Sequence, residues 1–123
     1  MEKVEKTWGW EHWFANNEKY CGKLIFVRYN EWSSKGRYHY HKIKDETFFV
    51  VEGVFILDYY TKDNKRKTIR LEKNESIRLE PGIKHRFKGA VKNGCKFIEA
   101  STTHMESDSY RCEWDPETKT WIE

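Results

Sequence analysis

The chain has 123 residues and a formal net charge of +3, with 23 basic and 20 acidic residues interspersed along it. This length allows one domain, and the mixed charge excludes a protein that binds nucleic acid by strong electrostatics. No stretch reaches the roughly 18 apolar residues of a membrane span, and the first residues lack the apolar segment of a signal peptide. We therefore expect a cytoplasmic protein with no membrane and no nucleic-acid partner.

The first segment, about residues 1–20, is an arm rich in aromatic side chains, namely Trp8, Trp10, Trp13 and Phe14. Such an arm more often covers an open end of a β-structure or an oligomer interface than it binds a ring-shaped ligand. Because a small barrel also has exposed sheet edges, the arm predicts a homodimer. The three cysteines of the chain form no Cys-x-x-Cys motif, which fits a reducing compartment.

Beyond the arm, short apolar or alternating segments of strand length recur, each bounded by Gly, Asn, Asp or Ser. None keeps the helical period long enough to predict an amphipathic helix. The pattern is typical of an all-β protein that closes into a sandwich or barrel, since a small open sheet would expose its edges. We expect this barrel over about residues 21–115, with strands at residues 23–29, 47–52, 54–60, 68–71, 76–79, 96–101 and 109–114.

The segment from His39 to Glu46 carries the most chemistry. On a strand, residues two apart point to the same face, so His39 and His41 would present their imidazoles together. Glu46 follows after four residues, and His85 follows a Pro-Gly turn that can bring a new strand to the same point. Three neutral imidazoles and one carboxylate predict a site for one divalent transition metal, such as Mn, Fe, Ni or Zn.

An isolated His-x-His pair is weak evidence for a metal, because a strand with two exposed histidines is common. The combination is stronger, since three of the five histidines fall into one arrangement with a carboxylate. The other two, His12 and His104, are interpreted as surface or rim residues.

The same residues match the two motifs of the cupin family. The first motif, His-x-His followed by Glu and then Gly, is matched by His39, His41, Glu46 and Gly53, and the second, ending in Pro-x-Gly-x-x-His, is approximated by residues 80–85. Three positions depart from the family pattern without removing a ligand: Asn74, Glu80 and Gly89. The chain thus resembles a small single-domain cupin, which implies a jelly-roll barrel (a double-stranded β-helix) within one domain over residues 1–123.

Outside these motifs, the chain resembles the cupin domain of type II mannose-6-phosphate isomerases, and also cupin sugar isomerases of the lyxose type. The resemblance rests on a Trp-Gly opening at residues 7–11, the His-Tyr-His-Lys segment at 39–46, and closing segments at 97–102 and 106–111. It implies a metal-dependent isomerase that moves a proton between neighbouring carbons of a sugar or sugar phosphate, with the ion as a Lewis acid.

Such a reaction needs a base and a group that holds the substrate. Glu99 is the first candidate base and Lys44 the second, although the periodicity equally allows Glu99 to face outward. The resemblance to the isomerase ending implies that Arg111 holds an anionic or hydroxylated substrate, with Arg28 and Arg37 as alternatives. Each arginine could instead be a surface salt-bridge partner.

Two other function classes stay open. A non-catalytic sugar-binding or regulatory cupin would keep the fold and the metal without a competent base. An iron-dependent cupin dioxygenase would use the same three histidines and one glutamate with molecular oxygen. Fold and ligand set do not determine the chemistry, so the surrounding residues must separate these classes.

Overall fold

The computed structural model describes residues 2–123, which form twelve β-strands and two short 3₁₀ segments. The strands are β1 (Glu2–Lys6), β2 (Gly9–Asn16), β3 (Cys21–Val27), β4 (Tyr38–Tyr40), β5 (Glu46–Gly53), β6 (Phe55–Tyr60), β7 (Arg66–Leu71), β8 (Ser76–Leu79), β9 (His85–Gly89), β10 (Cys95–Ser101), β11 (Tyr110–Asp115) and β12 (Thr120–Ile122). The 3₁₀ segments are η1 (Ser33–Gly36) and η2 (Glu106–Asp108). Across this described part, no helix is long and apolar enough to cross a membrane.

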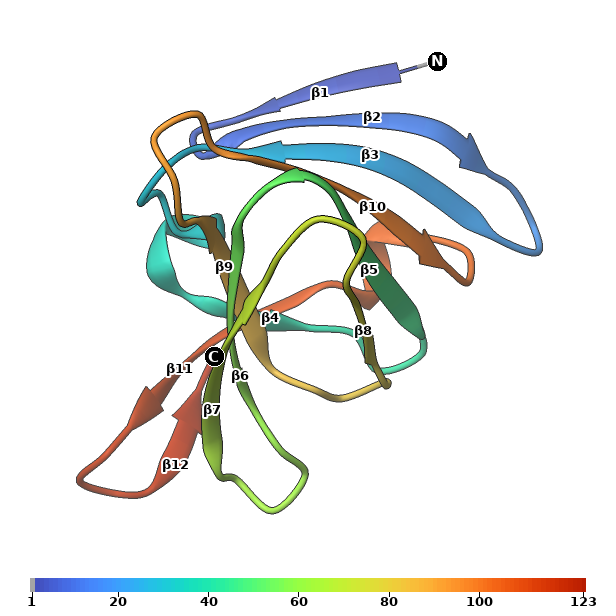
Figure 1. The fold of residues 1–123 in the computed structure, drawn as a ribbon. Coiled ribbons are helices and arrows are strands. Elements are labelled where there is room, and N and C mark those ends of the chain that lie inside the picture. Colours follow the sequence, from blue (N-terminus) through green and yellow to red (C-terminus); the bar gives the residue numbers. More distant parts are fainter. Residues whose placement is uncertain (1) are drawn as a thin grey trace.

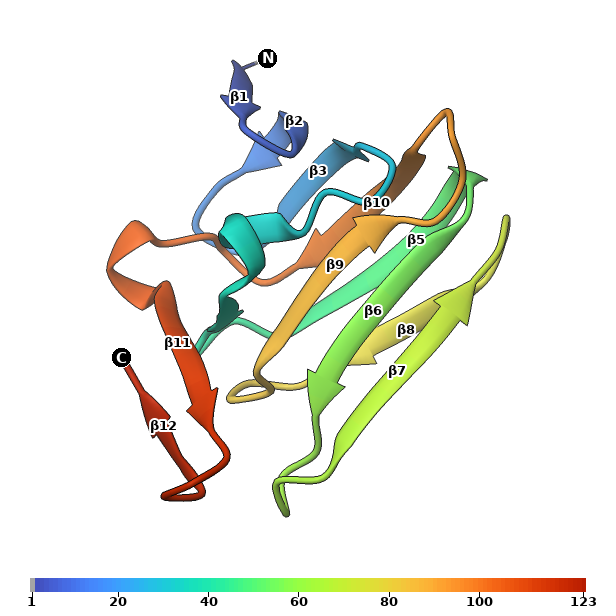
Figure 2. The same cartoon turned by 90° about the vertical axis from the view of Figure 1, so that its left-hand side faces the viewer.

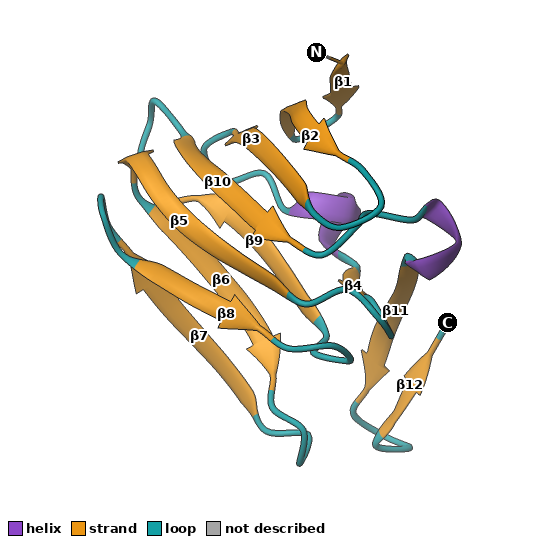
Figure 3. Cartoon of the chain, turned by 90° about the vertical axis from the view of Figure 1, so that its right-hand side faces the viewer, coloured by secondary structure: helices purple, strands orange, loops and turns teal. Residues whose placement is uncertain are grey.

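The strands form two six-stranded sheets, which lie as two layers in Figure 1 and Figure 2. The first sheet has the order β1-β2-β3-β10-β5-β8 and the second the order β12-β11-β4-β9-β6-β7. Figure 3 shows that strands and loops make up nearly the whole chain, with η1 and η2 near one end of the layers. The all-β prediction is confirmed, and each of the seven expected strands is present, with its ends shifted by at most two residues.

The N-terminal arm extends the first sheet by two strands. β1 pairs with β2 along its whole length, and β2 pairs with β3 through a register shift between Trp13 and Ala15. Trp8, in the turn between β1 and β2, is buried and packs edge-on against Phe87. The sequence pattern missed β1 because it reads Glu-Lys-Val-Glu-Lys, a charged composition that an edge strand tolerates. The homodimer stays a prediction.

Four phenylalanines fill the space between the two sheets. Phe48, Phe55, Phe87 and Phe97 are each at most 3% exposed. Their six pairs of ring centroids lie 4.6 to 5.9 Å apart, and four of these pairs are edge-on. Burial of one such side chain contributes about 1.5–3 kcal/mol, and the ring contacts add to it. This aromatic core therefore anchors both sheets in one relative position.

Asp58 ties the second sheet together on its other face. It is fully buried and accepts hydrogen bonds from the Tyr38 hydroxyl at 2.6 Å, from Arg66 at 2.8 and 2.9 Å, and from Arg86 Nε at 2.9 Å. Burial alone would raise the pKa of Asp58, but the hydrogen bonds from Arg66, Tyr38 and Arg86 outweigh it and hold the pKa below its ordinary value. The folded state thus favours the ionised carboxylate.

We expect Asp58→Asn to lower the free energy of unfolding at pH 7 by about 3 kcal/mol, because it leaves the partly buried Arg86 without its counter-ion. Since the folded state depresses the pKa of Asp58, the wild-type advantage is present above the ordinary pKa of an aspartate and shrinks as the pH falls below about 4. Urea unfolding at pH 7 and pH 3 measures both effects. The control Asp63→Asn, at an exposed turn, should change stability by less than about 0.5 kcal/mol. Equal stability of wild type and Asp58→Asn at pH 7 would contradict the assignment.

Candidate metal and ligand site

Strand pairing in the second sheet sets three predicted site residues side by side. Arg111 on β11 lies opposite His39 on β4, and His39 lies opposite His85 on β9. Directly opposed residues of antiparallel strands point to the same face. His41 follows β4 directly, and its ring centroid lies 5.6 Å from that of His39. The structure therefore brings His39, His41 and His85 together, although the chain separates His41 from His85 by a hairpin and two further strands.

The first sheet presents a charged row toward these histidines. Its register places Lys23 on β3 opposite Glu99 on β10, and Glu99 opposite Phe48 on β5, while Glu46 lies opposite Ser101 in the next row. Lys23, Glu46 and Glu99 are at most 4% exposed. Glu99 thus faces the interior, which the periodicity of its strand left undecided.

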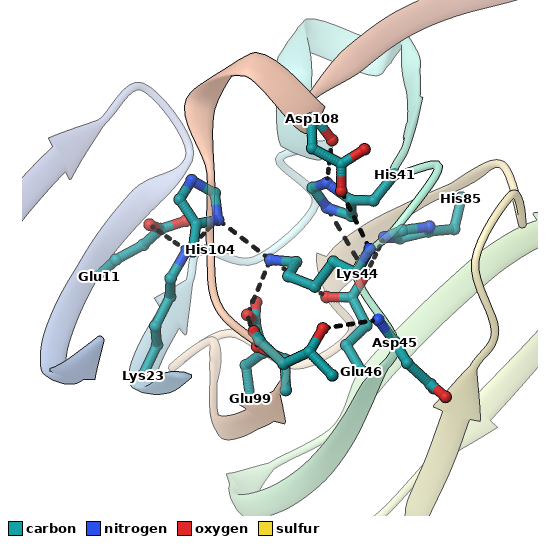
Figure 4. A network of polar contacts seen from close by, with 12 residues as sticks. Glu11, Lys23, His41, Lys44, Asp45, Glu46, His85, Glu99, His104 and Asp108 are labelled. Carbon is teal, nitrogen blue, oxygen red and sulfur yellow. Dashed lines mark hydrogen bonds and ion pairs between the residues drawn. The ribbon is translucent and has the colours of Figure 1, made fainter. Parts of the chain in front are cut away.

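Two histidine nitrogens converge on one oxygen of Glu46 (Figure 4). The Nε2 atoms of His41 and His85 each lie 3.7 Å from Glu46 Oε2. Their Nδ1 atoms lie 2.7 Å from the carbonyl oxygen of Asp108 and 2.9 Å from that of Ile83, so each Nδ1–H donates and each Nε2 keeps a free lone pair. Such carbonyl contacts hold histidines in the tautomer that binds a metal.

The donor atoms of this arrangement suit a divalent ion. Two atoms bound to one ion at about 2.1 Å each lie no more than about 4.2 Å apart, and both His–Glu46 separations meet this limit. His85 Nε2 and His39 Nδ1 are buried without a hydrogen-bond partner, as expected of atoms that await a ligand. As the side chains stand, no three His, Cys, Asp or Glu residues among residues 2–123 meet the geometry of a metal site. The ligand set His39, His41, Glu46 and His85 stays a prediction.

Burial lowers the pKa of all three site histidines. With Lys44 nearby, it lowers the pKa of His41 to about 4, and with His41 nearby it lowers that of His85 to about 3. Burial and the neighbouring His85 likewise hold the pKa of His39 well below its ordinary value. The three rings are therefore neutral at pH 7, the form that binds metals. Burial and the negative charge of Glu99 raise the pKa of Glu46. A cation bound between Glu46 and the histidines would stabilise the ionised form of Glu46.

The two candidates for proton transfer form one buried ion pair. Lys44 Nζ donates to Glu99 Oε2 at 2.9 Å and lies 3.9 Å from Glu46 Oε1. Burial alone would raise the pKa of Glu99, but the ammonium groups of Lys23 and Lys44 outweigh it and lower the pKa to about 2. Burial likewise disfavours the charge on Lys44, yet Glu99 and Glu46 raise its pKa above the ordinary value. At pH 7 Lys44 holds the proton and Glu99 does not.

Sequence reasoning missed Lys23 and gave His104 no role in this cluster. Lys23 is buried beside Glu99, and its ammonium lies 4.2 Å from the centre of the Trp13 ring. His104, expected at the surface or rim, has a side chain only 9% exposed and contacts both Lys23 and Lys44. The sequence carries no signal for the placement of Lys23, because Leu24 to Val27 are all apolar and leave both faces of β3 equivalent; the burial of Ile25 and Val27 shows which face is inside. His12, as expected, lies outside the site.

Asp108 shapes the turn between the histidines and Glu46. Its carboxylate accepts hydrogen bonds from the backbone N–H groups of Lys42, Ile43 and Lys44 at 2.8 to 3.2 Å. These bonds satisfy a turn that has no partner strand at this point. The segment thus delivers Lys44 and Glu46 to the interior together.

The cavity that contains these groups has a volume of about 400 Å³. Arg37 and Arg111 line it and are exposed, so they belong to its rim. Arg28 does not line it: its guanidinium donates to the carbonyl of Thr7 at 3.0 Å in an exposed position. The structure therefore brings two of the three candidate arginines to the site and leaves Arg28 outside.

Comparisons with solved structures show the fold. Oxalate decarboxylase from Bacillus subtilis superposes with a TM-score of 0.77 at 11% identity, over 89% of this chain and 29% of that one. The capsular polysaccharide assembling protein CapF from Staphylococcus aureus superposes with a TM-score of 0.77 at 15% identity, over 89% of this chain and 31% of that one. KdgF from Halomonas sp. superposes with a TM-score of 0.71 at 11% identity, over 87% of this chain and 92% of that one. The chain thus spans about a third of the first two proteins and nearly all of KdgF. No protein-family model and no curated sequence matches it.

These neighbours are cupins, so the predicted fold class is confirmed: the chain has the cupin fold, built from two antiparallel sheets. At 11 to 15% identity the similarity extends to the fold and not to the activity. The closer resemblance to mannose-6-phosphate isomerases is not tested by these structures and stays a prediction.

We expect His41→Ala to lower the affinity for Mn²⁺ by about 100-fold or more, because it removes one of the two nitrogens that converge on Glu46. Equilibrium dialysis followed by elemental analysis measures the bound metal. The matched control is His12→Ala, a histidine on β2 that packs against Trp10 and should leave binding unchanged. Full metal content in the His41→Ala protein would show that the ligand set is wrong.

Proposed function

We propose that the chain is a metal-dependent cupin enzyme that moves a proton between neighbouring carbons of a sugar or sugar phosphate. The observation that supports this most is the buried Lys44–Glu99 ion pair, which lies beside Glu46 in the same cavity as the three histidines. An acid and a carboxylate beside a candidate metal site are the groups that an isomerisation needs.

In this proposal, His39, His41, Glu46 and His85 hold one divalent ion. The Mn(II) centres of the structurally similar oxalate decarboxylase support an ion of this kind. When bound, the ion would supply Lewis-acid stabilisation of negative charge on a substrate oxygen.

A sugar-sized, oxygen-rich ligand fits the cavity in size and chemistry. Its volume of about 400 Å³ lies in the range of small-molecule pockets, and its walls carry charged and hydroxyl side chains. Arg111 lies in register with His39, so its guanidinium can reach a ligand that approaches the histidines. The description of CapF as a capsular polysaccharide assembling protein further supports a carbohydrate.

The proton transfer follows from the state of the ion pair. Glu99, ionised, takes the proton from the hydroxyl-bearing substrate carbon and returns it to the neighbouring carbonyl carbon, while the hydroxyl proton of the first carbon passes to the oxygen of the second. Lys44, protonated, donates a hydrogen bond to the substrate oxygen that gains negative charge. A substrate that draws Lys44 toward its own oxygen weakens the pair with Glu99, and this raises the basicity of the carboxylate at the moment when a base is needed.

A non-catalytic sugar-binding cupin is the second candidate, and the same ion pair favours it. While Lys23 and Lys44 hold the pKa of Glu99 near 2, the carboxylate is a weak base. A binding module requires only that the cavity holds its ligand, whereas an enzyme requires that the substrate loosens the pair.

Solvent exchange separates the two candidates. With a panel of aldoses, ketoses and their phosphates in deuterium oxide, we expect the Mn²⁺-loaded protein to exchange the transferred hydrogen, at C2 of an aldose or at C1 of a ketose. Glu99→Gln should slow this exchange by about 10²–10⁴-fold while metal binding persists, because it removes the base and keeps the shape. Mass spectrometry follows the exchange. Ligand binding without exchange in the wild type would establish the binding module, and iron-dependent oxygen consumption would establish the dioxygenase.

The rim arginines provide a test of substrate class. We expect Arg111→Gln to weaken binding of an anionic sugar by about 10- to 100-fold, because the substitution removes one or two charge-assisted hydrogen bonds. Arg28→Gln is the control, since Arg28 lies outside the cavity. Isothermal titration with matched neutral and phosphorylated sugars measures the difference. Equal losses for Arg111→Gln and Arg28→Gln would rule out a role of Arg111 in the site.

A further inference from the structure

His104 links the two buried lysines of the site, as Figure 4 shows. It lies in the loop between β10 and η2, and its side chain is 9% exposed, whereas that of its neighbour Glu106 is 82% exposed. His104 Nδ1 lies 3.1 Å from Lys44 Nζ and 3.3 Å from Lys23 Nζ. One ring nitrogen therefore contacts both ammonium groups.

These contacts assign one tautomer to the ring. An ammonium group only donates, so Nδ1 must be the acceptor and the ring proton must be on Nε2. Nε2 lies 3.0 Å from Glu106 Oε1 and donates to it. Both ring nitrogens thus have partners of the correct kind, and the neutral form fits them all.

The backbone and the ring of His104 are also held in place. Its N–H donates to Asn16 Oδ1 at 3.0 Å, and Asn16 Nδ2 donates back to its carbonyl oxygen at 3.3 Å. The ring packs edge-on against Trp13, with centroids 4.8 Å apart. The loop is thereby fixed to the end of β2, and the position of Nδ1 does not depend on the lysines alone.

The Lys44 ammonium group has three neighbouring partners, which lie at different distances. Its ammonium lies 2.9 Å from Glu99, 3.1 Å from His104 and 3.9 Å from Glu46. If His104 offered no acceptor, the buried ammonium would need a replacement, because an unsatisfied buried charge is costly. Glu46 is the next available oxygen, and a lysine bound there would compete with a divalent ion.

We propose that His104 is a positioning residue that holds Lys44 on Glu99 and so leaves Glu46 free to face His41 and His85. The proposal rests on the metal site of the proposed function, and it concerns a residue outside the predicted ligand set. The His104 ring also lies edge-on to that of the predicted ligand His41, with centroids 6.2 Å apart; in the proposed role it acts through Lys44.

The test compares His104→Leu, which removes the acceptor, with His104→Asn, whose side-chain oxygen can take the place of Nδ1. We expect His104→Leu to weaken Mn²⁺ binding by about 10- to 100-fold, the usual effect of losing an outer partner of a metal site. His104→Asn should restore most of the affinity. His12→Leu is the matched control and should bind Mn²⁺ as the wild type does. Titration calorimetry with Mn²⁺ alone gives the affinities, and circular dichroism verifies that each variant is folded.

Nuclear magnetic resonance gives a second readout that needs no metal. In the wild type labelled with ¹⁵N at histidine and lysine, His104 should carry its proton on Nε2, and His104→Leu should shift the Nζ signal of Lys44. A wild-type His104 with its proton on Nδ1 would overturn the proposal, as would a folded His104→Leu protein with unchanged Mn²⁺ affinity and Lys44 signal. If the wild type binds no divalent metal, the proposed function fails, and the tautomer and the lysine signal still decide whether His104 positions Lys44. If His104→Leu does not fold, the wild-type tautomer and the His104→Asn affinity decide the question.

Discussion

The two-residue period of the strands couples the site to the hydrophobic core. On four strands a polar residue of the site lies two positions from a buried core residue and hence on the same face. The pairs are Lys23 with Ile25, Glu46 with Phe48, His85 with Phe87, and Glu99 with Phe97. Burial of each apolar member forces its polar partner inward, and a slip of one residue would expose both. The aromatic core therefore fixes the register that assembles the charged end of the cavity.

The core residues hold these charged side chains in the interior, so their opposite charges must lie close enough to neutralise one another. Lys23, Lys44, Glu46 and Glu99 are each at most 4% exposed, and an unpaired charge at that depth costs several kcal/mol. The lysines flank Glu99, and Lys44 also approaches Glu46. The positive charges lower the pKa of Glu99 while burial raises that of Glu46, so two carboxylates in one cavity differ in their readiness to bind a proton. Environments that shift the pKa values of two neighbouring carboxylates in opposite directions are typical of acid–base sites.

The cupin fold by itself does not select among the activities of its structural neighbours. The side chains around the predicted metal ligands must therefore supply the information about activity. The Lys44–Glu99 pair is fixed by Ser101, which donates to Glu99 Oε2 at 2.9 Å, and by His104. The turn that delivers Lys44 is fixed by Asp108. The proposed oxygen-rich ligand would meet charged groups that are already held in place, and Arg37 and Arg111 line the rim of the same cavity.

The sequence by itself determined seven of the twelve strands and the local part of the site. Alternation and turn residues depend on sterics within a few positions, so the positions of the seven expected strands and the spacing of His39, His41 and Glu46 could be derived without a structure. The tertiary structure decided which distant residues complete the site. Lys23 and His104 are 81 residues apart and Lys44 and Glu99 are 55 apart, yet each pair is in contact. Such contacts arise from the pairing of strands and the packing of two sheets, which bring distant residues together irrespective of local periodicity. For this reason only the fold could show that Glu99 faces inward, that Arg28 lies outside, and that His104 contacts the two buried lysines.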